Sequence, residues 1–252
     1  MFRRDSDYGS DQVDAREVEK LAAVEDAMWW FRGLHGVLAG AIRRHAPAGP
    51  VLDAGSGTGG FLKRLASAMP GRVLAGLDRD PLAATLAGRR WGGPVAVGSV
   101  DRMPFPDAHF AAIVSADVLC HAGVDEETAI AEAHRCLMPG GIYVLNLPAY
   151  DWMFSDHDRA VDTARRYTRR GIGRQLEAAG FGRTRASYWN TLLFPLMVAR
   201  RKLLPRGASD VSLGPAPVER LFGGIVGLEE RWISAGRGLP FGGSVLAVGI
   251  KT

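Results

Sequence analysis

The sequence of 252 residues predicts an α/β fold in which helices cover both faces of a mostly parallel, doubly wound sheet. Short segments rich in Val, Leu and Ile alternate with segments of helical periodicity, as strands buried on both faces do. A glycine-rich turn joins the first predicted strand to the helix after it. The predicted strands cover residues 50–54, 72–78, 94–98, 110–116 and 141–147.

Two of the helices between these strands carry clear start signals. Asp80-Pro81 supplies a capping side chain followed by proline at the first helical position. Asp125-Glu126-Glu127 supplies a cap and two acids in the first turn, where they favour the positive end of the helix dipole. The second of these helices stops before Pro139-Gly140-Gly141. Alternating strand and helix units of this kind form a parallel sheet with right-handed crossovers.

The two ends of the chain follow a different pattern. Helices are predicted for about residues 14–28 and then, after an aromatic cluster, up to about residue 45. We interpret residues 1–48 as an N-terminal helical cap and residues 49–252 as the main domain, with lid or substrate insertions at about 149–167 and 190–240. Beyond residue 147 we expect helices at 168–179, 191–203 and 217–233, and strands at 183–189 and 244–250.

Composition and charge are those of an ordinary soluble protein. The chain holds 47% hydrophobic and 23% charged residues, with 31 basic and 27 acidic side chains, a net charge of +4. The basic excess is small and local, so nucleic acid is not the expected partner. The N-terminus lacks the apolar stretch of a signal peptide, the apolar run 192–199 is too short to span a bilayer, and we expect a cytoplasmic protein. Cys120 and Cys136 lack metal-ligand spacing and are expected to be buried, and no metal site is predicted.

The glycine-rich turn, Val51-Leu52-Asp53-Ala54-Gly55-Ser56-Gly57-Thr58-Gly59, suits two kinds of nucleotide ligand. With Gly60 it also satisfies the dinucleotide fingerprint, so a nicotinamide enzyme must be considered. Asp53 separates the two, because a carboxylate there repels a pyrophosphate and attracts an ammonium group. Asp78 ends the next strand, where a carboxylate accepts ribose hydroxyls in either case. Asp53 therefore favours S-adenosylmethionine.

Several ordered segments resemble the class I S-adenosylmethionine-dependent methyltransferases, in particular the bacterial small-molecule group. The glycine turn matches the first family motif, and Leu77-Asp78 matches the second. Residues 98–105 resemble the third, and residues 115–121 and 137–141 resemble the segments at strands four and five. The resemblance implies a Rossmann-like, seven-stranded sheet whose final strand, 244–250, is antiparallel. It also implies S-adenosylmethionine as cofactor and S-adenosylhomocysteine as product.

The resemblance further implies which residues contact the cofactor. The aromatic segment 29–32 resembles one that closes over the methionine end of the cofactor, although packing within a helix would explain it equally well. Ser99 stands where the family commonly has an acid beside adenine, and Cys120 stands where glutamate is common. The expected contacts are Trp30, Phe31, Asp53, Gly55, Ser56, Gly57, Asp78, Arg79, Ser99, Val100, Ser115 and His121.

Catalytic groups should lie beyond the carboxyl ends of strands four and five. His157 is the first candidate for a general base, oriented by Asp156 or Asp158, with Tyr150 and Asp117 as further candidates. Residues 165–170, Arg-Arg-Tyr-Thr-Arg-Arg, suit an anionic substrate, but a solvated basic helix start explains them too. Residues 192–202 are apolar and then basic, which leaves open contact with a membrane surface, burial in the core, or a homodimer interface.

The predicted function is methyl transfer to oxygen, nitrogen or carbon of a small molecule, such as a tailoring substrate of secondary metabolism. A cofactor-binding enzyme that catalyses a cyclisation or rearrangement without methyl transfer is one alternative. RNA or protein methylation and a nicotinamide-dependent oxidoreductase are others. The sequence does not identify the acceptor, the use of a general base, or the oligomeric state.

Overall fold

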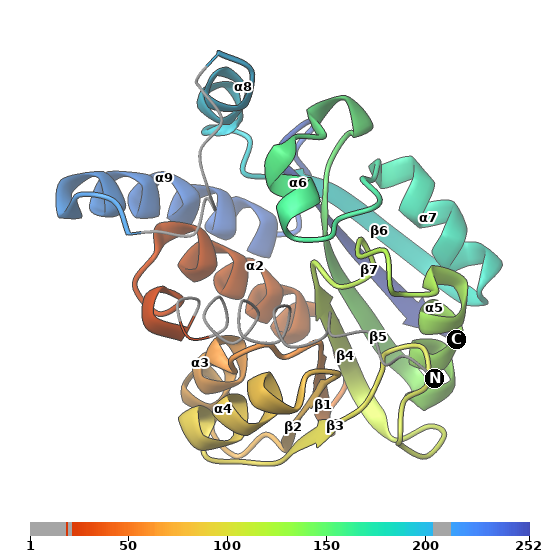
Figure 1. Cartoon of the computed structure of the whole chain (residues 1–252). Helices are drawn as coiled ribbons and strands as arrows, with labels where there is room; N and C mark the ends of the chain where they lie inside the picture. Colours follow the sequence, from red (N-terminus) through yellow and green to blue (C-terminus); the bar gives the residue numbers. More distant parts are fainter. Residues whose placement is uncertain (1–18, 20–21, 204–212) are drawn as a thin grey trace, which may run out of the picture.

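A computed structural model describes residue 19 and residues 22–203 and 213–252 of the chain. Its centre is a seven-stranded sheet with the order β3-β2-β1-β4-β5-β7-β6 (Figure 1). β1 to β5 pair in parallel, whereas β7 lies antiparallel between β5 and β6, as the resemblance implied. The strands are β1 (Val51–Ala54), β2 (Leu74–Asp78), β3 (Val95–Val97), β4 (Phe110–Ala116), β5 (Leu137–Pro148), β6 (Phe181–Trp189) and β7 (Ser244–Lys251).

Helices cover both faces of this sheet, as the alternating pattern predicts (Figure 1). One core cluster lies between the sheet and α5 and α7, and the other between the sheet and α2 and α3, with α9 packed on α2. The helices are α2 (Trp29–His45), α3 (Gly60–Ala68), α4 (Pro81–Trp91), α5 (Glu126–Cys136), α6 (Asp156–Ala160), α7 (Arg169–Ala178), α8 (Phe194–Leu203) and α9 (Ala216–Ser234), with a short 3-10 helix at Asp151–Met153. None of the described helices is long and apolar enough to cross a membrane.

The capping predictions are confirmed. Asp80 Oδ1 accepts a hydrogen bond from Leu82 N at 2.9 Å, and Pro81 opens α4. Asp125 Oδ1 accepts from Thr128 N at 3.2 Å at the start of α5. Local side chains therefore fix where these helices begin.

Two predicted boundaries are wrong. β5 begins at Leu137 and not at residue 141, because Leu137 pairs with Phe110 before the Pro139-Gly140-Gly141 turn shifts the register. The aromatic cluster at residue 29 opens α2 and does not precede it. Gly33, directly after the aromatic segment, lies within α2, where a side chain would collide with Val226 of α9. Part of the helix predicted at 14–28 (residues 14–18, 20 and 21) lies outside the described residues, and the described part is helical only up to Val24, with a turn at residues 25–27.

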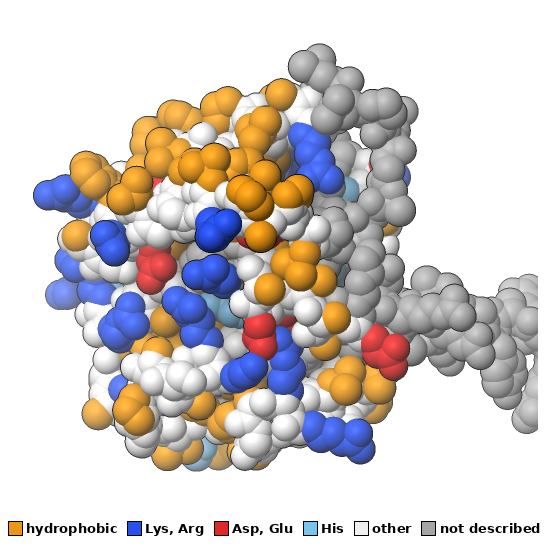
Figure 2. All heavy atoms as spheres, turned by 90° about the vertical axis from the view of Figure 1, so that its left-hand side faces the viewer, with side chains coloured by type: hydrophobic (Ala, Val, Ile, Leu, Met, Phe, Trp, Pro, Cys, Tyr) orange, Lys and Arg blue, Asp and Glu red, His pale blue; other side chains and the backbone are white. Residues whose placement is uncertain are grey.

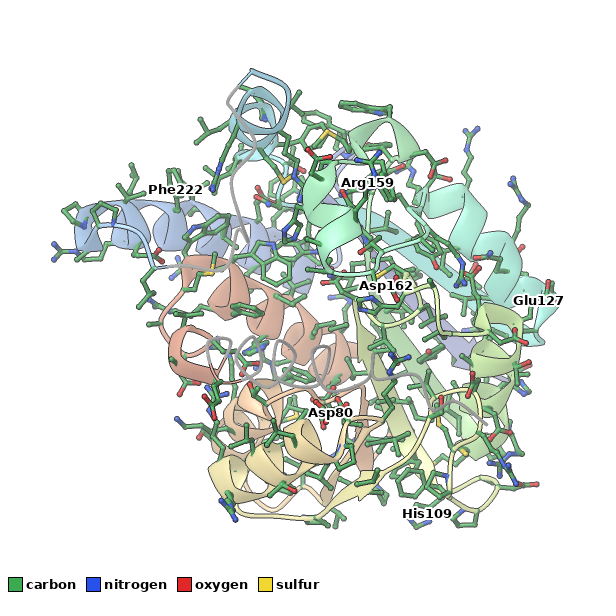
Figure 3. The ribbon with its side chains drawn as sticks, viewed as in Figure 1. Asp80, His109, Glu127, Arg159, Asp162 and Phe222 are labelled. Atoms are coloured by element: carbon green, nitrogen blue, oxygen red, sulfur yellow. The ribbon has the colours of Figure 1, made fainter. Side chains whose placement is uncertain are left out.

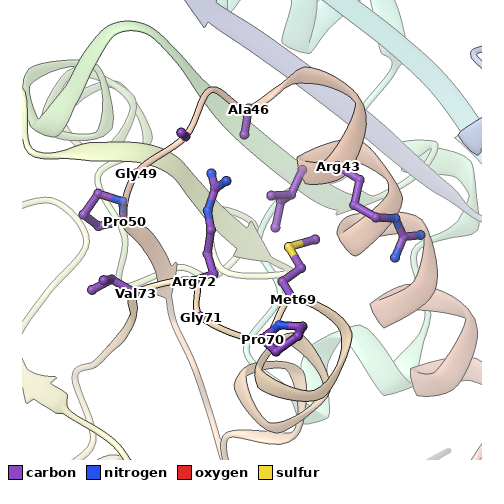
Figure 4. Close-up of a pocket in the computed structure, with 11 residues that line it drawn as sticks. Arg43, Ala46, Gly49, Pro50, Met69, Pro70, Gly71, Arg72 and Val73 are labelled. Atoms are coloured by element: carbon purple, nitrogen blue, oxygen red, sulfur yellow. The ribbon is translucent and has the colours of Figure 1, made fainter.

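The two ends of the parallel strands differ in character. The carboxyl ends of β1, β2 and β4 lie side by side with the glycine turn, and we call this border of the sheet the glycine edge. A surface hollow of about 540 Å³ lies at the opposite edge, between the end of α2 and the residues that lead into β1 and β2 (Figure 4). The predicted polar site residues lie in the loops at the glycine turn and not at this hollow.

Candidate active site

The glycine turn is anchored to the strand beside it. Gly55 N and Ser56 N both donate to Leu77 O, at 2.7 and 2.9 Å. Gly55 has a φ of 93° and lies so close to Val118 that an added Cβ would collide with it. Gly57 has a φ of 51°, but an added Cβ there would meet no atom of the described residues within 4 Å. The turn is thus closed behind Gly55 and open in front of Gly57, as a ligand cradle must be.

Asp78 supports this turn and faces the same space. Its Oδ2 accepts from Gly57 N at 2.7 Å, and its Oδ1 accepts from Asp80 N at 3.0 Å. Burial raises the pKa of this carboxyl, and the two backbone hydrogen bonds act in the opposite direction. Each carboxylate oxygen has a second lone pair, so Asp78 can accept two ribose hydroxyls without losing its backbone bonds.

Asp53 lies beneath the turn and is only 3% exposed. Burial raises its pKa well above the ordinary range, and the negative charges of Glu25 and Asp78 raise it further. Three carboxyl groups therefore share one side of the glycine turn. An ammonium group or a sulfonium is stabilised in that field, whereas the pyrophosphate of a dinucleotide is repelled.

Glu25 is a site residue that the sequence did not reveal. Its carboxylate accepts from Thr58 Oγ1 at 2.5 Å and from Arg90 Nη1, and lies 3.6 Å from His35 Nε2. Burial lowers the pKa of His35 to about 3, which keeps its ring neutral. The group fastens the segment before α2 onto the glycine turn and the start of α3.

Further features of the edge suit a nucleoside with an amino-acid tail. Ser56 Oγ is buried and has no hydrogen-bond partner among the described residues. Trp30 and Phe31, both in the first turn of α2, stand edge to face with ring centroids 4.9 Å apart, and Trp30 lies 6.1 Å from Trp189. With Asp53, Gly57 and Asp78, these groups fit S-adenosylmethionine.

Strained backbone marks the neighbouring strand ends. Asp117 follows β4, Tyr150 lies two residues after β5, and Asn190 follows β6, and their φ angles are 55°, 61° and 57°. Non-glycine residues adopt this left-handed conformation at a cost, and such strain gathers at functional sites. The three positions lie at one edge because β4, β5 and β6 run in the same direction.

Asp117 belongs to a buried polar relay. Asn146 Nδ2 donates to both Asp117 oxygens, each at 3.0 Å, and Trp189 Nε1 donates to Asn146 Oδ1 at 2.5 Å. Burial raises the pKa of Asp117 to about 7, against a lowering by Asn146 and Arg166. Asp117 is a carboxyl group poised to exchange a proton near neutral pH.

Tyr150 lies in a stack of aromatic rings. Its ring centroid lies 5.0 Å from that of Tyr188 and 5.8 Å from those of Trp152 and Phe194. Burial raises the pKa of Tyr150 to about 12, so the phenol keeps its proton at neutral pH. Tyr150 can donate a hydrogen bond or line an apolar surface, but it is poorly suited as a base.

The predicted lid contains α6, which carries His157. The acids beside His157 have arginine partners: Asp156 pairs with Arg159 at 2.6 Å, and Asp158 pairs with Arg166 at 2.6 Å in a fully buried contact. Asp158 also caps α6 by accepting from Ser155 N at 2.8 Å. Figure 3 places Arg159 and Asp162 on this lid. Asp158 thus holds the lid together.

The first two arginines of residues 165–170 bind groups of the protein itself. Arg165 donates to Leu119 O at 2.7 Å and to Val124 O at 2.9 Å, while Arg166 donates to Ala149 O at 2.7 Å as well as to Asp158. These guanidinium groups fasten the lid to the body, because the loop carbonyls there need donors.

The remaining predicted cofactor residues form two groups. Ser115 and Val100 are buried, whereas Arg79, Ser99 and His121 lie in the loops that follow β2, β3 and β4. Ser115 is fully buried and its hydroxyl accepts from Tyr143 OH at 3.2 Å, so this side chain faces the core and not the ligand edge. Val100 is also buried in the core. Ser99 O accepts a hydrogen bond from Arg102 N at 3.2 Å, and His121 forms an isolated antiparallel β-bridge with Thr163. Arg79 is exposed beside Gly123.

Comparison with known proteins agrees with this geometry. Residues 52–145, which run from β1 to β5, match the family described as a methyltransferase domain. Residues 52–145 thus form a class I, S-adenosylmethionine-dependent methyltransferase domain. An Arabidopsis thaliana 24-methylenesterol C-methyltransferase is 31% identical over 135 residues, which cover 51% of this chain and 36% of that protein. A probable S-adenosylmethionine-dependent methyltransferase of Mycolicibacterium smegmatis is 29% identical over 131 residues, which cover 51% and 49%.

Solved structures show the same fold for the methyltransferase domain and the elements around it. A SAM-dependent methyltransferase from Thermotoga maritima aligns over 94% of this chain and 95% of its own, with a TM-score of 0.59 and 19% identity. A geranyl diphosphate methyltransferase aligns over 87% and 77%, with a TM-score of 0.59 and 18% identity. The aligned regions span half or less of the curated relatives' length, 36% and 49%.

Proposed function

We propose that this chain transfers the methyl group of S-adenosylmethionine to a hydroxyl or amino group on a small acceptor with an apolar body. The observation that carries the proposal is the cluster of Asp53, Glu25 and Asp78 around an open glycine turn, with Asp117 at the same edge of the sheet. The cluster suits a cationic donor, and Asp117 suits an acceptor that must lose a proton.

The chemistry needs little from the protein beyond alignment and proton transfer. When bound, S-adenosylmethionine supplies an electrophilic methyl group, whose bond to sulfur breaks with the electron pair passing to sulfur. Asp117 takes the proton that the acceptor atom loses as its lone pair forms the new bond to the methyl carbon. Asn146 and Trp189 hold the Asp117 carboxylate in place. Positioning the acceptor in line with the methyl group supplies much of the acceleration.

Asp117 is preferred to the other two candidate bases on physical grounds. Its pKa of about 7 balances the fraction that is deprotonated against its affinity for a proton. Tyr150, with a pKa of about 12, remains protonated. His157 belongs to the lid, and we keep it as the base of a lid-closed state if Asp117 proves dispensable.

An apolar acceptor body is favoured by the aromatic side chains at the ends of β5 and β6. Tyr150 and Phe194 are only partly buried there, Tyr150 stacks on the buried ring of Tyr188, and the arginines of the lid are bound to protein acceptors. Aromatic walls with a few polar groups are typical of sites for apolar ligands. Two of the similar proteins are named for methylating a sterol and geranyl diphosphate, which agrees with such an acceptor.

The proposal is tested in two steps with the full chain. Calorimetry should detect binding of S-adenosylmethionine and not of NADPH, and Asp53→Asn should weaken it. Incubation with methyl-labelled S-adenosylmethionine and a panel of phenols, isoprenoid alcohols and amines should then produce S-adenosylhomocysteine together with a labelled acceptor. Binding of NADPH alone contradicts the cofactor, and turnover of the cofactor without label in any product favours a rearrangement.

A further inference from the structure

The outward side of α9 is unusual for a helix of a soluble domain. Leu221 is 61% exposed, Leu228 is 59% exposed and Trp232 is 46% exposed, and Val218 continues the stripe toward the helix start. The opposite side of α9 is also apolar, because Val226 packs on Gly33 of α2 and Phe222 meets Trp29 edge to face. A helix that is apolar on two sides needs a second partner for the exposed stripe.

The acidic and basic side chains of α9 lie on different sides of the helix. Glu229 is buried and accepts from Thr191 N and Leu192 N, Glu219 accepts from Trp29 N, and Glu230 points at Gly36. All three acids of the helix thus face the protein. The exposed residues of α9 are only apolar residues, a glycine and two arginines: Ala216, Pro217, Val218, Arg220, Leu221, Gly224, Leu228, Arg231 and Trp232.

This surface continues toward the candidate active site. Leu192, two residues before α8, is 58% exposed, and Leu196, in the first turn of α8, is 53% exposed. α8 stands off the body of the protein above α9 (Figure 1). Phe241 and Trp152 are also exposed, and both rings lie 6.1 Å from that of Phe194, which contacts Tyr150. Figure 2 shows hydrophobic side chains gathered over the upper part of one face, with Lys and Arg side chains below them.

We propose that this face, formed by α9, the first turn of α8 and the rings of Trp152 and Phe241, binds the surface of an anionic lipid bilayer. Leucines and a tryptophan can enter the interface between headgroups and acyl chains, while Arg220 and Arg231 contact anionic headgroups. Neither arginine forms an ion pair with a carboxylate of the described residues. The Arg237 guanidinium lies over the Trp232 ring, 4.5 Å from its centroid, which adds a further cation at this depth.

A second copy of the chain is the less suitable occupant. A two-fold dimer through this face would bring the arginines of one copy toward those of the other, because the exposed residues of α9 include no acid. An anionic bilayer removes that repulsion. The proposed contact would also set the aromatic rings near Tyr150 against the lipid, so that an apolar acceptor could enter from the membrane.

The test measures partition onto vesicles by sedimentation, with the full chain and no turnover, so its outcome is independent of the proposed function. The chain should bind vesicles of phosphatidylcholine mixed with phosphatidylglycerol and bind pure phosphatidylcholine more weakly. The Leu221→Ser, Leu228→Ser double variant should lose about tenfold in partition for each leucine. Arg220→Gln with Arg231→Gln should lose about fivefold per arginine, and only on the anionic vesicles.

A matched control removes equally exposed side chains elsewhere. Val73 and Val97 are 64% and 56% exposed near the β2–β3 edge of the sheet, and their replacement by serine should leave vesicle binding unchanged. Thermal melting by circular dichroism identifies any variant that fails to fold. If the leucine variant fails, Trp232→Ala is measured in its place. Three results overturn the proposal: no binding to anionic vesicles, equal binding by the α9 and control variants, or a dimer in light scattering that Leu228→Asp disperses.

Discussion

Asn146 Nδ2 lies 3.0 Å from each carboxylate oxygen of Asp117, so one amide group from β5 spans the carboxylate at the end of β4. The orientation of the amide is fixed, because Trp189 Nε1 donates to its oxygen at 2.5 Å. An amide group held in this way can only donate toward Asp117. The arrangement stabilises the charged form of a carboxyl group whose burial favours the neutral form.

Replacing Asp117 should therefore separate catalysis from folding. We expect Asp117→Asn to lower kcat about 100-fold or more, as loss of a general base does. The wild-type rate should rise with pH through about 7, because the base acts only when it is deprotonated. The variant should lack this step. The measurement is a pH–rate profile for both proteins with an acceptor identified in the labelling screen.

Stability provides the control for this variant. The folded-state pKa of Asp117 is raised, so the protein is most stable when this group is protonated and loses stability as pH rises from about 4 toward 7. Removing the ionisable group should leave the melting temperature at pH 8 equal to that of the wild type or above it. If activity and melting temperature fall together, Asp117 is structural, and the role of base passes to His157.

Replacing Asn146 should move the pH dependence without removing it. The hydrogen bonds from Asn146 lower the pKa of Asp117, so Asn146→Ala should raise that pKa and shift the rise in rate to higher pH. Trp189→Phe leaves Asn146 Oδ1 buried without its donor, which costs about 1 to 3 kcal/mol and frees the amide to rotate. We expect a smaller shift in the same direction. A profile unchanged in both variants contradicts the relay.

The parts of the site that lie close together in sequence could be predicted. Asp53, Gly55 and Gly57 belong to one turn, and Asp78 ends the next strand, so periodicity and turn chemistry locate all four. The strand and helix order follows for the same reason, since each element has its own local pattern. Asp80 and Asp125 cap their helices through hydrogen bonds to residues two and three positions away.

The parts that depend on distant contacts could not be predicted. Glu25 and Arg90 are 65 positions apart, and Asn146 and Trp189 are 43 positions apart, so no local pattern links them. The residue type of Ser115 gave no sign that its hydroxyl pairs with Tyr143 in the core. Arg165 has the residue type of a surface cation, but it binds the carbonyls of Leu119 and Val124, which lie 46 and 41 positions away in the sequence.

The two carboxylates of the cofactor site should respond differently to a shortened ligand. Asp78 is proposed to hold ribose, so Asp78→Asn should weaken binding of both S-adenosylhomocysteine and adenosine, by about 10-fold for the lost charged hydrogen bonds. Asp53 is proposed to stabilise the ammonium end, so Asp53→Asn should weaken S-adenosylhomocysteine alone. Calorimetry with the two ligands provides the comparison. Equal effects of Asp53→Asn on both ligands contradict its assignment to the amino-acid end.

The Glu25–Arg90 ion pair should stabilise the contact between the segment before α2 and the glycine turn. Arg90→Gln leaves a buried carboxylate with weaker partners, which should cost about 3 kcal/mol of stability. The double variant Glu25→Gln, Arg90→Gln should recover most of this loss, because the uncompensated charge is gone. Denaturant unfolding of the wild type, of Arg90→Gln, of Glu25→Gln and of the double variant completes the cycle. A double variant as unstable as Arg90→Gln shows that packing, and not charge, dominates this contact.

Alanine at the two glycines of the turn should damage two different properties. Gly55→Ala places a Cβ against Val118 at a φ of 93°, so we expect a loss of stability of about 2 to 4 kcal/mol, partly restored by Val118→Ala. In Gly57→Ala the new methyl group meets no atom within 4 Å in the part of the chain that the structure describes, and the variant should cost only about 1 kcal/mol for its φ of 51°. Its methyl group instead enters the space assigned to the cofactor, so affinity for S-adenosylhomocysteine should fall while the fold persists. Thermal melting and calorimetry on both variants measure the two effects, and a Gly57→Ala protein with unchanged affinity would move the cofactor away from this turn.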